Sequence, residues 1–456
     1  MLRWGRSIRA LLYKGNIMAF PRFLQRLLTT IVLLPAFFAY AGASEIVLHT
    51  FAGAPDDGAN PAGGLIADGA ANLYGTTPAG GTFGAGTVYM LPAVTGTTDI
   101  VLYNFTGGTD GGTPLSTLVM DSSGNLWGTT EHGGNVSSCT SGCGVVFELT
   151  PVGGGAYTET VVYTFSGLSD GGLPKAGLTM DSSGNLYGTA SCGGSGSCAS
   201  GGGYGVVFAI SSGAFSVLHT FTSTADGATP VAPVIINGTV LYGTTKFGGG
   251  AGTCSSTGCG VVFALSLTTG SITIQHPFSG GTDGGEPLGS VVLNPATGIL
   301  YGTASCGGMT TICSSGTGGS GNGVVFKVGS TGTSFSVLHK FNGANGANPA
   351  AGLVFNSAKS YLYGTTEFGG VTTGSCAPAG CGVVFKMKLT GSETVLYKFA
   401  GGKHGANPVA GVVLAPGVDD DKQSPPPQRG GCTGACGVTT SDGNSSDDGV
   451  GFQTST

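Results

Sequence analysis

Short apolar runs alternate with small polar turns along the chain, without the 3.6-residue period of an amphipathic helix. In residues 177–221, for example, the runs GLTM, LYGTA, GVVFAI and VLHTF are separated by segments rich in Gly, Ser and Asn. Short runs rich in β-branched and aromatic residues, bounded by such turn residues, are typical of β-strands. Each unit therefore predicts an antiparallel meander of four strands, which we name a to d in chain order.

The same unit recurs along the chain, and its second run is the easiest to align. The copies are LYGTT at 73–77, LWGTT at 126–130, LYGTA at 186–190, LYGTT at 241–245, LYGTA at 300–304 and LYGTT at 362–366. One such sheet buries little apolar surface alone, so units of this kind stack around an axis. We therefore expect an all-β protein, a β-propeller of four-stranded antiparallel blades. A parallel β-helix is the alternative, although its repeats are shorter.

The two ends of the repeat region predict how the ring closes. A strand of type d, residues 46–51, precedes the first full unit, and a strand of type a, residues 411–416, follows the last. Pairing them in one blade gives seven blades, the last degenerate. Six blades are the alternative, because no LYGTT copy follows residue 417 and CTGACGV at 432–438 resembles only a loop and the start of strand c.

The composition of the chain divides it into three segments. Residues 1–43 hold six Lys and Arg, no acidic residue, an apolar run and the sequence Ala-Gly-Ala, which predict a secretory signal peptide; a retained anchor is the alternative, and Met18 is a second candidate start. Residues 44–417 are the predicted propeller. Residues 418–456 are polar and rich in Ser, Asp and Gly, so we expect a disordered tail that holds a remnant of a repeat.

The net charge of the chain limits the classes of partner that it can bind. Losing six positive charges with the signal takes the net charge from −6 to −12. Such a chain lacks the basic surface that binds nucleic acid or an anionic membrane, and it has no membrane span after signal cleavage. We expect a monomer that is secreted and is extracellular, at the cell surface or periplasmic.

The 12 cysteines occur in close pairs in the b–c loops and in the last, degenerate unit. Export permits disulfides, and separations that vary from pair to pair suit bonds within a loop better than a zinc site, which is the alternative. A catalytic thiol at Cys192 lacks a His in its own loop. The predicted disulfides are Cys139–Cys143, Cys192–Cys198, Cys254–Cys259, Cys306–Cys313 and Cys376–Cys381, with Cys432–Cys436 as a sixth candidate.

The d–a turns contain an Asp before Gly, which is first of all a turn residue. A ring of such carboxylates also suits Ca²⁺, the one cofactor the sequence leaves open. The candidate calcium ligands are Asp110, Asp170, Asp226 and Asp283. In strand d, His49, His219 and His339 stand where other copies have Tyr, so we interpret them as packing residues. We interpret His132, His276 and His404 as scattered.

The blocks LYGTT, GG, GVVF and DG-x-x-P recur in a fixed order over residues 47–415, and in this the chain resembles the GloVer tandem-repeat proteins, which are secreted bacterial repeats attached to a choice of C-terminal anchors. The segment GLTMDSSGNLYG at 177–188 is similar to NHL-type propeller repeats. The resemblance implies that the protein is exported and lies at the cell surface or outside the cell, but it implies no particular activity. This chain departs from the family in lacking a C-terminal hydrophobic segment or an LPxTG-like motif.

No set of catalytic residues recurs or stands out, so we predict no catalytic, cofactor-binding or metal residues beyond the calcium candidates. The first hypothesis is a non-enzymatic propeller that binds a glycan or an extracellular protein, or serves as a scaffold. It places recognition on the b–c loops. The alternative is a polysaccharide-active hydrolase or lyase, with acid and base drawn from different blades.

Overall fold

The structure is a computed structural model and describes residues 45–93, 99–134, 138–200, 202–223, 225–250, 252–254, 258–309, 313, 321–415, 434–441 and 449–454. They belong to one compact unit, Ala43–Thr456. The predicted signal segment lies outside the described residues.

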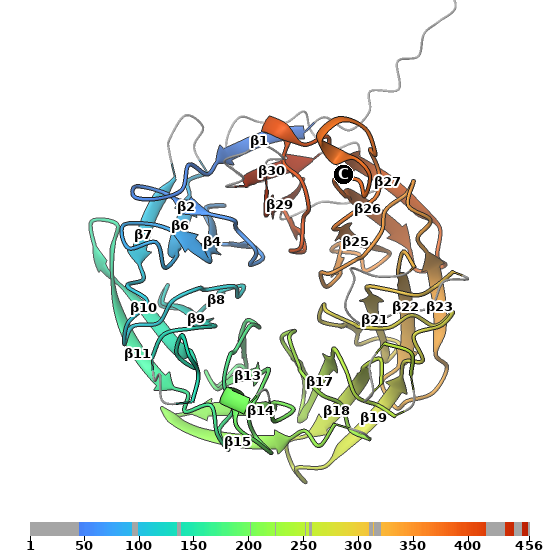
Figure 1. The fold of residues 1–456 in the computed structure, drawn as a ribbon, viewed down its shortest axis with the longest axis horizontal. Helices are drawn as coiled ribbons and strands as arrows, with labels where there is room; N and C mark the ends of the chain where they lie inside the picture. The colour runs from blue at the N-terminus through green and yellow to red at the C-terminus, as the bar shows by residue number, and fades with distance from the viewer. Residues whose placement is uncertain are drawn as a thin grey trace, which may run out of the picture. The chain divides into compact units, whose positions relative to one another are not determined.

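Seven four-stranded antiparallel sheets form the blades of a propeller, arranged in a ring (Figure 1). The prediction of an all-β propeller with seven blades is confirmed, and the six-bladed alternative is wrong. In the part of the chain that the structure describes, no helix is long and apolar enough to cross a membrane.

The strand bounds follow the repeat. Blades 1 to 3 consist of β3 (Ile66–Ala67), β4 (Leu73–Thr77), β6 (Thr87–Leu91) and β7 (Ile100–Asn104); β8 (Val119–Met120), β9 (Leu126–Thr130), β10 (Val145–Gly153) and β11 (Ala156–Thr164); and β12 (Thr179–Met180), β13 (Leu186–Ala190), β14 (Val206–Ser211) and β15 (Ala214–Thr220). Blades 4 to 6 consist of β16 (Ile235–Asn237), β17 (Val240–Thr245), β18 (Val261–Ser266) and β19 (Ile272–Pro277); β20 (Val292–Asn294), β21 (Ile299–Ala304), β22 (Val324–Gly329) and β23 (Ser336–Lys340); and β24 (Val354–Phe355), β25 (Tyr361–Thr366), β26 (Val383–Lys388) and β27 (Glu393–Lys398).

Blade 7 joins the two ends of the chain. It consists of β28 (Val413–Leu414), β29 (Ala435–Thr439), β30 (Val450–Thr454) and β1 (Glu45–Thr50). The remaining elements are a small sheet of β2 (Gly58–Ala59) and β5 (Ala79–Gly80), and the 3₁₀ turns η1 (Cys198–Ser200), η2 (Gly374–Cys376) and η3 (Gly402–His404).

Strand c is apolar without alternation because neighbouring blades cover both of its faces. In blade 2, Val145, Val146 and Phe147 are fully buried. The Phe147 ring lies across strand b at Gly128, where an added Cβ would come within 2.5 Å of it. The glycine of LYGTT is therefore required by this close approach, which explains why the motif recurs.

A threonine of the same motif ties neighbouring blades together. In six blades the first Thr of LYGTT or its variant donates a hydrogen bond, at 2.8 to 3.2 Å, to a backbone carbonyl just before strand a of the next blade. In blade 2 the pair is Thr129 and the carbonyl of Ala176. In blade 7 this position is Val438, which is buried and has no hydroxyl group.

The predicted disorder beyond residue 439 is wrong for residues 450–454, which form strand c of blade 7. There β30 pairs on one side with β29 and on the other with β1, for example Phe452 with Val47. The segment that resembled the start of strand c is in fact strand b, ACGVT. This strand keeps the glycine that the close approach of the strand c Phe requires, since a Cβ on Gly437 would lie 2.9 Å from the ring of Phe452.

Candidate functional site

The b–c loops and the d–a turns emerge at the same end of every blade, because each blade is a simple meander. We call this surface the loop face. The five disulfides predicted within b–c loops are present, with Cα atoms 5.0 to 5.5 Å apart, so that prediction is confirmed. Cys192 is bonded to Cys198 and is no free thiol. Cys432, of the sixth candidate pair, lies outside the described residues.

Disulfides of neighbouring blades meet across a glycine of the d–a turn. A Cβ on Gly285 would lie 2.8 Å from Sγ of Cys254 in blade 4 and 2.9 Å from Sγ of Cys313 in blade 5. A Cβ on Gly172, between blades 2 and 3, would likewise lie 2.9 Å from Sγ of Cys198. The disulfides therefore brace neighbouring loops against each other as well as closing their own.

A residue with left-handed backbone precedes each proline of the d–a turns. These residues have φ between 52 and 57° and are Asn60, Thr113, Leu173, Thr229, Glu286, Asn348 and Asn407. At Thr113 the N–H donates to the carbonyl of Ala85 in blade 1, and the carbonyl accepts from the N–H of Glu131 in blade 2. This conformation is rare for residues other than glycine. Here it is held by backbone hydrogen bonds that link two blades, and it needs no ligand to explain it.

Large apolar side chains are exposed on the loop face. Phe83, Tyr204 and Met309 lie in the b–c loops of blades 1, 3 and 5, and their exposed fractions are 60, 37 and 44%. Leu168 is exposed in the d–a turn that follows blade 2. Apolar side chains exposed on loops and turns of a rigid scaffold are typical of recognition surfaces.

A cavity of about 250 Å³ follows the axis of the ring. Short segments between the d–a prolines and the strands of type a line it: 62–65, 115–117, 175–177, 231, 233, 288–290, 350–353 and 409–412. Lys175 is the single charged residue among these lining residues, and its Nζ lies 2.8 Å from Oε1 of Glu131. More than half of the lining residues are Gly, Ala or Ser.

In strand d, a His or Tyr contacts the Asp of the d–a turn that follows it. The pairs are His49–Asp57, Tyr103–Asp110, Tyr163–Asp170, His219–Asp226 and His276–Asp283. Each Asp also accepts a backbone N–H at the start of its own turn, such as that of Thr106 for Asp110.

The structure thus places the calcium candidates Asp110, Asp170, Asp226 and Asp283 in four separate turns. Among the described residues, no cluster of potential metal ligands includes any of them. Calcium binding by these residues stays a prediction.

The histidines are less scattered than the sequence indicated. His276 stands in the same strand position as His219, since each pairs with the second Val of strand c. The interpretation of His276 as a scattered residue is therefore wrong; the run TIQHPF hid its alignment with VLHTF. His404 lies in η3, with Nδ1 2.7 Å from Oε2 of Glu45.

Four residues before each His or Tyr of strand d stands a residue that packs on the preceding blade. In blades 3 and 5 it is Phe215, stacked on Tyr163 at 3.8 Å, and Phe335, stacked on His276 at 3.5 Å. In blade 4 the position holds Ile272. In the other four blades it is acidic: Glu45, Asp99, Glu159 and Glu393.

We call the blade junctions formed by these four residues the acidic junctions, and they are consecutive around the ring. Each acidic side chain has one buried carboxylate oxygen without a hydrogen-bond partner. Burial raises the pKa of Glu393, and burial together with the charge of Asp110 raises the pKa of Glu159 to about 7. Sequence reasoning missed these residues, although aligning the copies of strand d exposes the position.

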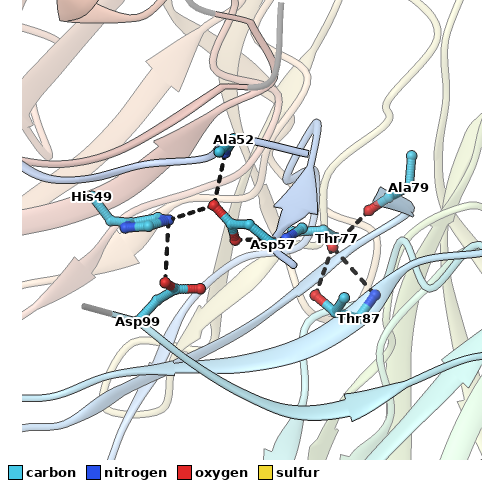
Figure 2. Close-up of polar contacts among 8 residues, drawn as sticks. His49, Ala52, Asp57, Thr77, Ala79, Thr87 and Asp99 are labelled. Carbon is cyan, nitrogen blue, oxygen red and sulfur yellow. Dashed lines mark hydrogen bonds and ion pairs between the residues drawn. The ribbon is translucent and has the colours of Figure 1, made fainter. Parts of the chain in front are cut away.

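One acidic junction, between blades 7 and 1, also contains a histidine and a second carboxylate. Figure 2 shows His49 between Asp57 and Asp99, with Nε2 3.0 Å from Oδ2 of Asp57 and 3.6 Å from Oδ1 of Asp99. We call these three residues the closure cluster. Burial raises the pKa of Asp99 to about 6, helped by the charge of Asp57 and opposed by that of His49. Burial also disfavours the charged form of Asp57, but hydrogen bonds from His49 and the N–H of Ala52 lower its pKa overall.

A family model, the Gloeobacter/Verrucomicrobia repeat, matches residues 36–200, 136–317 and 255–418. None of the curated proteins compared with the chain matches it.

Several solved structures are similar in fold. Oligogalacturonate lyase from Vibrio parahaemolyticus has a TM-score of 0.50 at 8% identity, and the match covers 91% of this chain and 94% of that one. TolB from Acinetobacter baumannii has a TM-score of 0.37 at 13% identity, covering 72% and 61% of the two chains. A gluconolactonase from Xanthomonas campestris has a TM-score of 0.37 at 12% identity, covering 71% and 86%.

Proposed function

The chain belongs to the Gloeobacter/Verrucomicrobia repeat family, whose model matches most of its length, and we propose that it is a non-enzymatic binding protein outside the cytoplasm, with its recognition site on the loop face. The observation that carries this proposal is the set of exposed side chains Phe83, Leu168, Tyr204 and Met309 on loops and turns of that face. Burying such side chains against a partner is favourable, and rigid loops lose little entropy when they bind.

The disulfides support a place outside the cytoplasm. Five disulfides in one chain persist only where the environment is oxidising, as in the periplasm or the extracellular space. The segment 1–43 has the composition of a secretory signal, which supports the same location.

The charge of the chain supports a neutral polar partner, such as a glycan. With 17 Lys and Arg in the whole chain and one charged residue in the cavity lining, basic groups that would bind an anionic ligand are scarce. Aromatic and other apolar faces, with backbone amides and carbonyls around them, suit the mixed apolar and hydroxylated surface of a sugar.

The second candidate is a polysaccharide-active hydrolase or lyase. Two Lys–Glu pairs near the axial segments favour it, because they supply titratable groups: Lys175 with Glu131 at 2.8 Å, and Lys246 with Glu286 at 3.7 Å. The fold shared with oligogalacturonate lyase carries no argument about the reaction at 8% identity.

A glycan array and a polysaccharide-degradation screen on residues 44–456 separate these functions. We expect binding to a neutral glycan without release of product. The double variant Phe83→Ala with Tyr204→Ala should weaken binding at least tenfold. Val152→Ala is the matched control, because Val152 is 61% exposed in the β10–β11 hairpin at the opposite face.

Release of product that is lost in Glu131→Gln would contradict the binding proposal and support the enzyme. Binding that survives the double variant but is lost in Val152→Ala would place recognition on the other face. No binding and no turnover would leave a scaffold as the function.

A further inference from the structure

We propose that the closure cluster, His49, Asp57 and Asp99, is a binding site for one divalent transition-metal ion of the Zn²⁺ class. The site would join blade 1 to strand β1 of blade 7, the strand that closes the ring by pairing with β30. None of its three residues is among the calcium candidates or the exposed side chains proposed to bind a glycan.

The three ligand atoms already have the spacing that such an ion requires. His49 Nε2 lies 3.0 Å from Oδ2 of Asp57 and 3.6 Å from Oδ1 of Asp99, and the three ligand atoms all lie within 4.8 Å of one another. In tetrahedral zinc sites with bonds of about 2.0–2.2 Å, ligand atoms lie roughly 3.3–3.6 Å apart. Shifts of a few tenths of an ångström therefore suffice for the two distances to His49.

The chemistry of the ligands selects the metal class. One imidazole with two carboxylates suits zinc and its neighbours, which accept nitrogen and oxygen ligands. Calcium and magnesium prefer oxygen ligands alone and in larger number. Three protein ligands leave a fourth position for water.

A second observation, independent of the ligand spacing, points to a bound cation. Oδ2 of Asp99 is buried without a hydrogen-bond partner, and the whole Asp99 side chain is only 11% exposed. Two carboxylates thus share a largely buried site with one imidazole. Burying charge without compensation is unfavourable, and a divalent ion compensates both carboxylates at once.

Backbone hydrogen bonds already orient the carboxylate of Asp57. Oδ1 of Asp57 accepts the N–H of Gly58 at 2.6 Å, and Oδ2 accepts the N–H of Ala52 at 2.7 Å (Figure 2). Such outer contacts hold a ligand in place before the metal arrives.

The other blade junctions provide internal controls because each lacks at least one of the three ligands. His219–Asp226 and His276–Asp283 are His–Asp pairs, but the third position in those junctions holds Ile272 and Phe335. At the junction of His339 and Glu393, the turn has Asn345 where the closure cluster has an Asp. We therefore expect one ion per chain.

The experiment uses residues 44–456 without a histidine tag, treated with chelator, and titrates Zn²⁺ alone by isothermal calorimetry. We expect one Zn²⁺ per chain and a rise in Tm when the ion is added. Asp99→Asn should weaken binding at least tenfold. Asp226→Asn is the matched control, since it removes the same group from a two-ligand pair, and it should bind as the parent does.

A second variant distinguishes loss of the ion from loss of the fold. His49→Tyr introduces the residue that blades 1, 2 and 6 carry at this position, where it bonds an acidic side chain, so it should fold and yet lose the ion. X-ray absorption of the bound zinc should show one nitrogen with oxygen ligands.

Each contrary result would overturn the proposal. These results are the absence of Zn²⁺ binding by the parent chain, equal binding by Asp99→Asn or His49→Tyr, equal loss in Asp226→Asn, and sulfur in the zinc shell. Sulfur ligands would assign the ion to cysteines of opened disulfides.

Discussion

Replacing Glu159 by Gln tests whether the acidic junctions cost stability at neutral pH. Burial, and then the charge of Asp110, raises the pKa of Glu159 from its ordinary 4.5 to about 7. A carboxyl group with a higher pKa in the folded state contributes stability that is full below pH 4.5 and is lost as the pH rises through about 7. At about 1.4 kcal/mol per pKa unit, ionisation at pH 8 costs at most ~3 kcal/mol, and solvent screening at this partly exposed side chain reduces that to roughly 1–2 kcal/mol.

The substitution keeps the size of the side chain and removes the charge. We expect Glu159→Gln to raise Tm by about 1–3 °C at pH 8 and to leave it nearly unchanged at pH 4.5, measured by calorimetry at a fixed scan rate. Asp56→Asn is the control, because it makes the same change of charge at an exposed residue. An equal gain at both pH values, or an equal gain in the control, would refute the argument from burial.

Three further changes test the packing of the ring. Tyr242→Ala removes a side chain that is 7% exposed, so it should cost about 3–5 kcal/mol and lower Tm; a normal Tm with loss of glycan binding would make Tyr242 a binding residue instead. Val438→Thr restores the hydroxyl group that six blades use between neighbours and should add about 1 kcal/mol, measured as a rise in Tm; a fall would show that the hydroxyl finds no acceptor. Deleting residues 449–454 removes the only partner strand of β1 among the described residues and exposes one edge of β29, so size-exclusion chromatography should show aggregation; a monomer of unchanged Tm would contradict the strand assignment.

The propeller and its disulfides follow from the sequence because the residues that impose them recur. Gly128 and Phe147 require each other in one blade, and the same pair of residue types marks the next blade. Because every blade needs the same packing contact, the residues that make it recur at the same position of each repeat, and the sequence alone shows them. The Cys pairs are visible for the same reason, since both partners lie in one loop.

The seventh blade was harder to predict, because its pattern is held by fewer residues. In strand b the sequence is ACGVT, so Cys436 replaces the aromatic residue and Val438 the first Thr. In strand c, GVGFQT keeps the Gly, the first Val and the Phe of GVVF, but Gly451 replaces the second Val and polar residues follow the Phe. The long separation from β1 hid the partner strand that makes these residues a sheet.

The closure cluster was missed for a different reason. Its residues come from three places, namely a strand of blade 7, the turn that follows it and the residue before strand d of blade 1, and periodicity within one copy relates none of them. Asp57 can be recognised in the sequence as a turn residue. Asp99 is harder to recognise, because the residues at its position in the other copies are Glu, Phe or Ile. Contacts between blades depend on how the ring closes, which the pattern of one repeat leaves open.

Strands β1 and β30, which close the ring in blade 7, place the two ends of the described chain beside each other. Glu45 pairs with Thr454, so the first and last described residues lie where a c–d turn stands in the other blades. A linker as short as a hairpin turn would join them and leave blade 7 with four strands continuous in the chain. Opening the circle at a d–a turn would then produce seven uninterrupted blades with the same contacts. We therefore expect a circular permutant opened at a d–a turn to form the same ring.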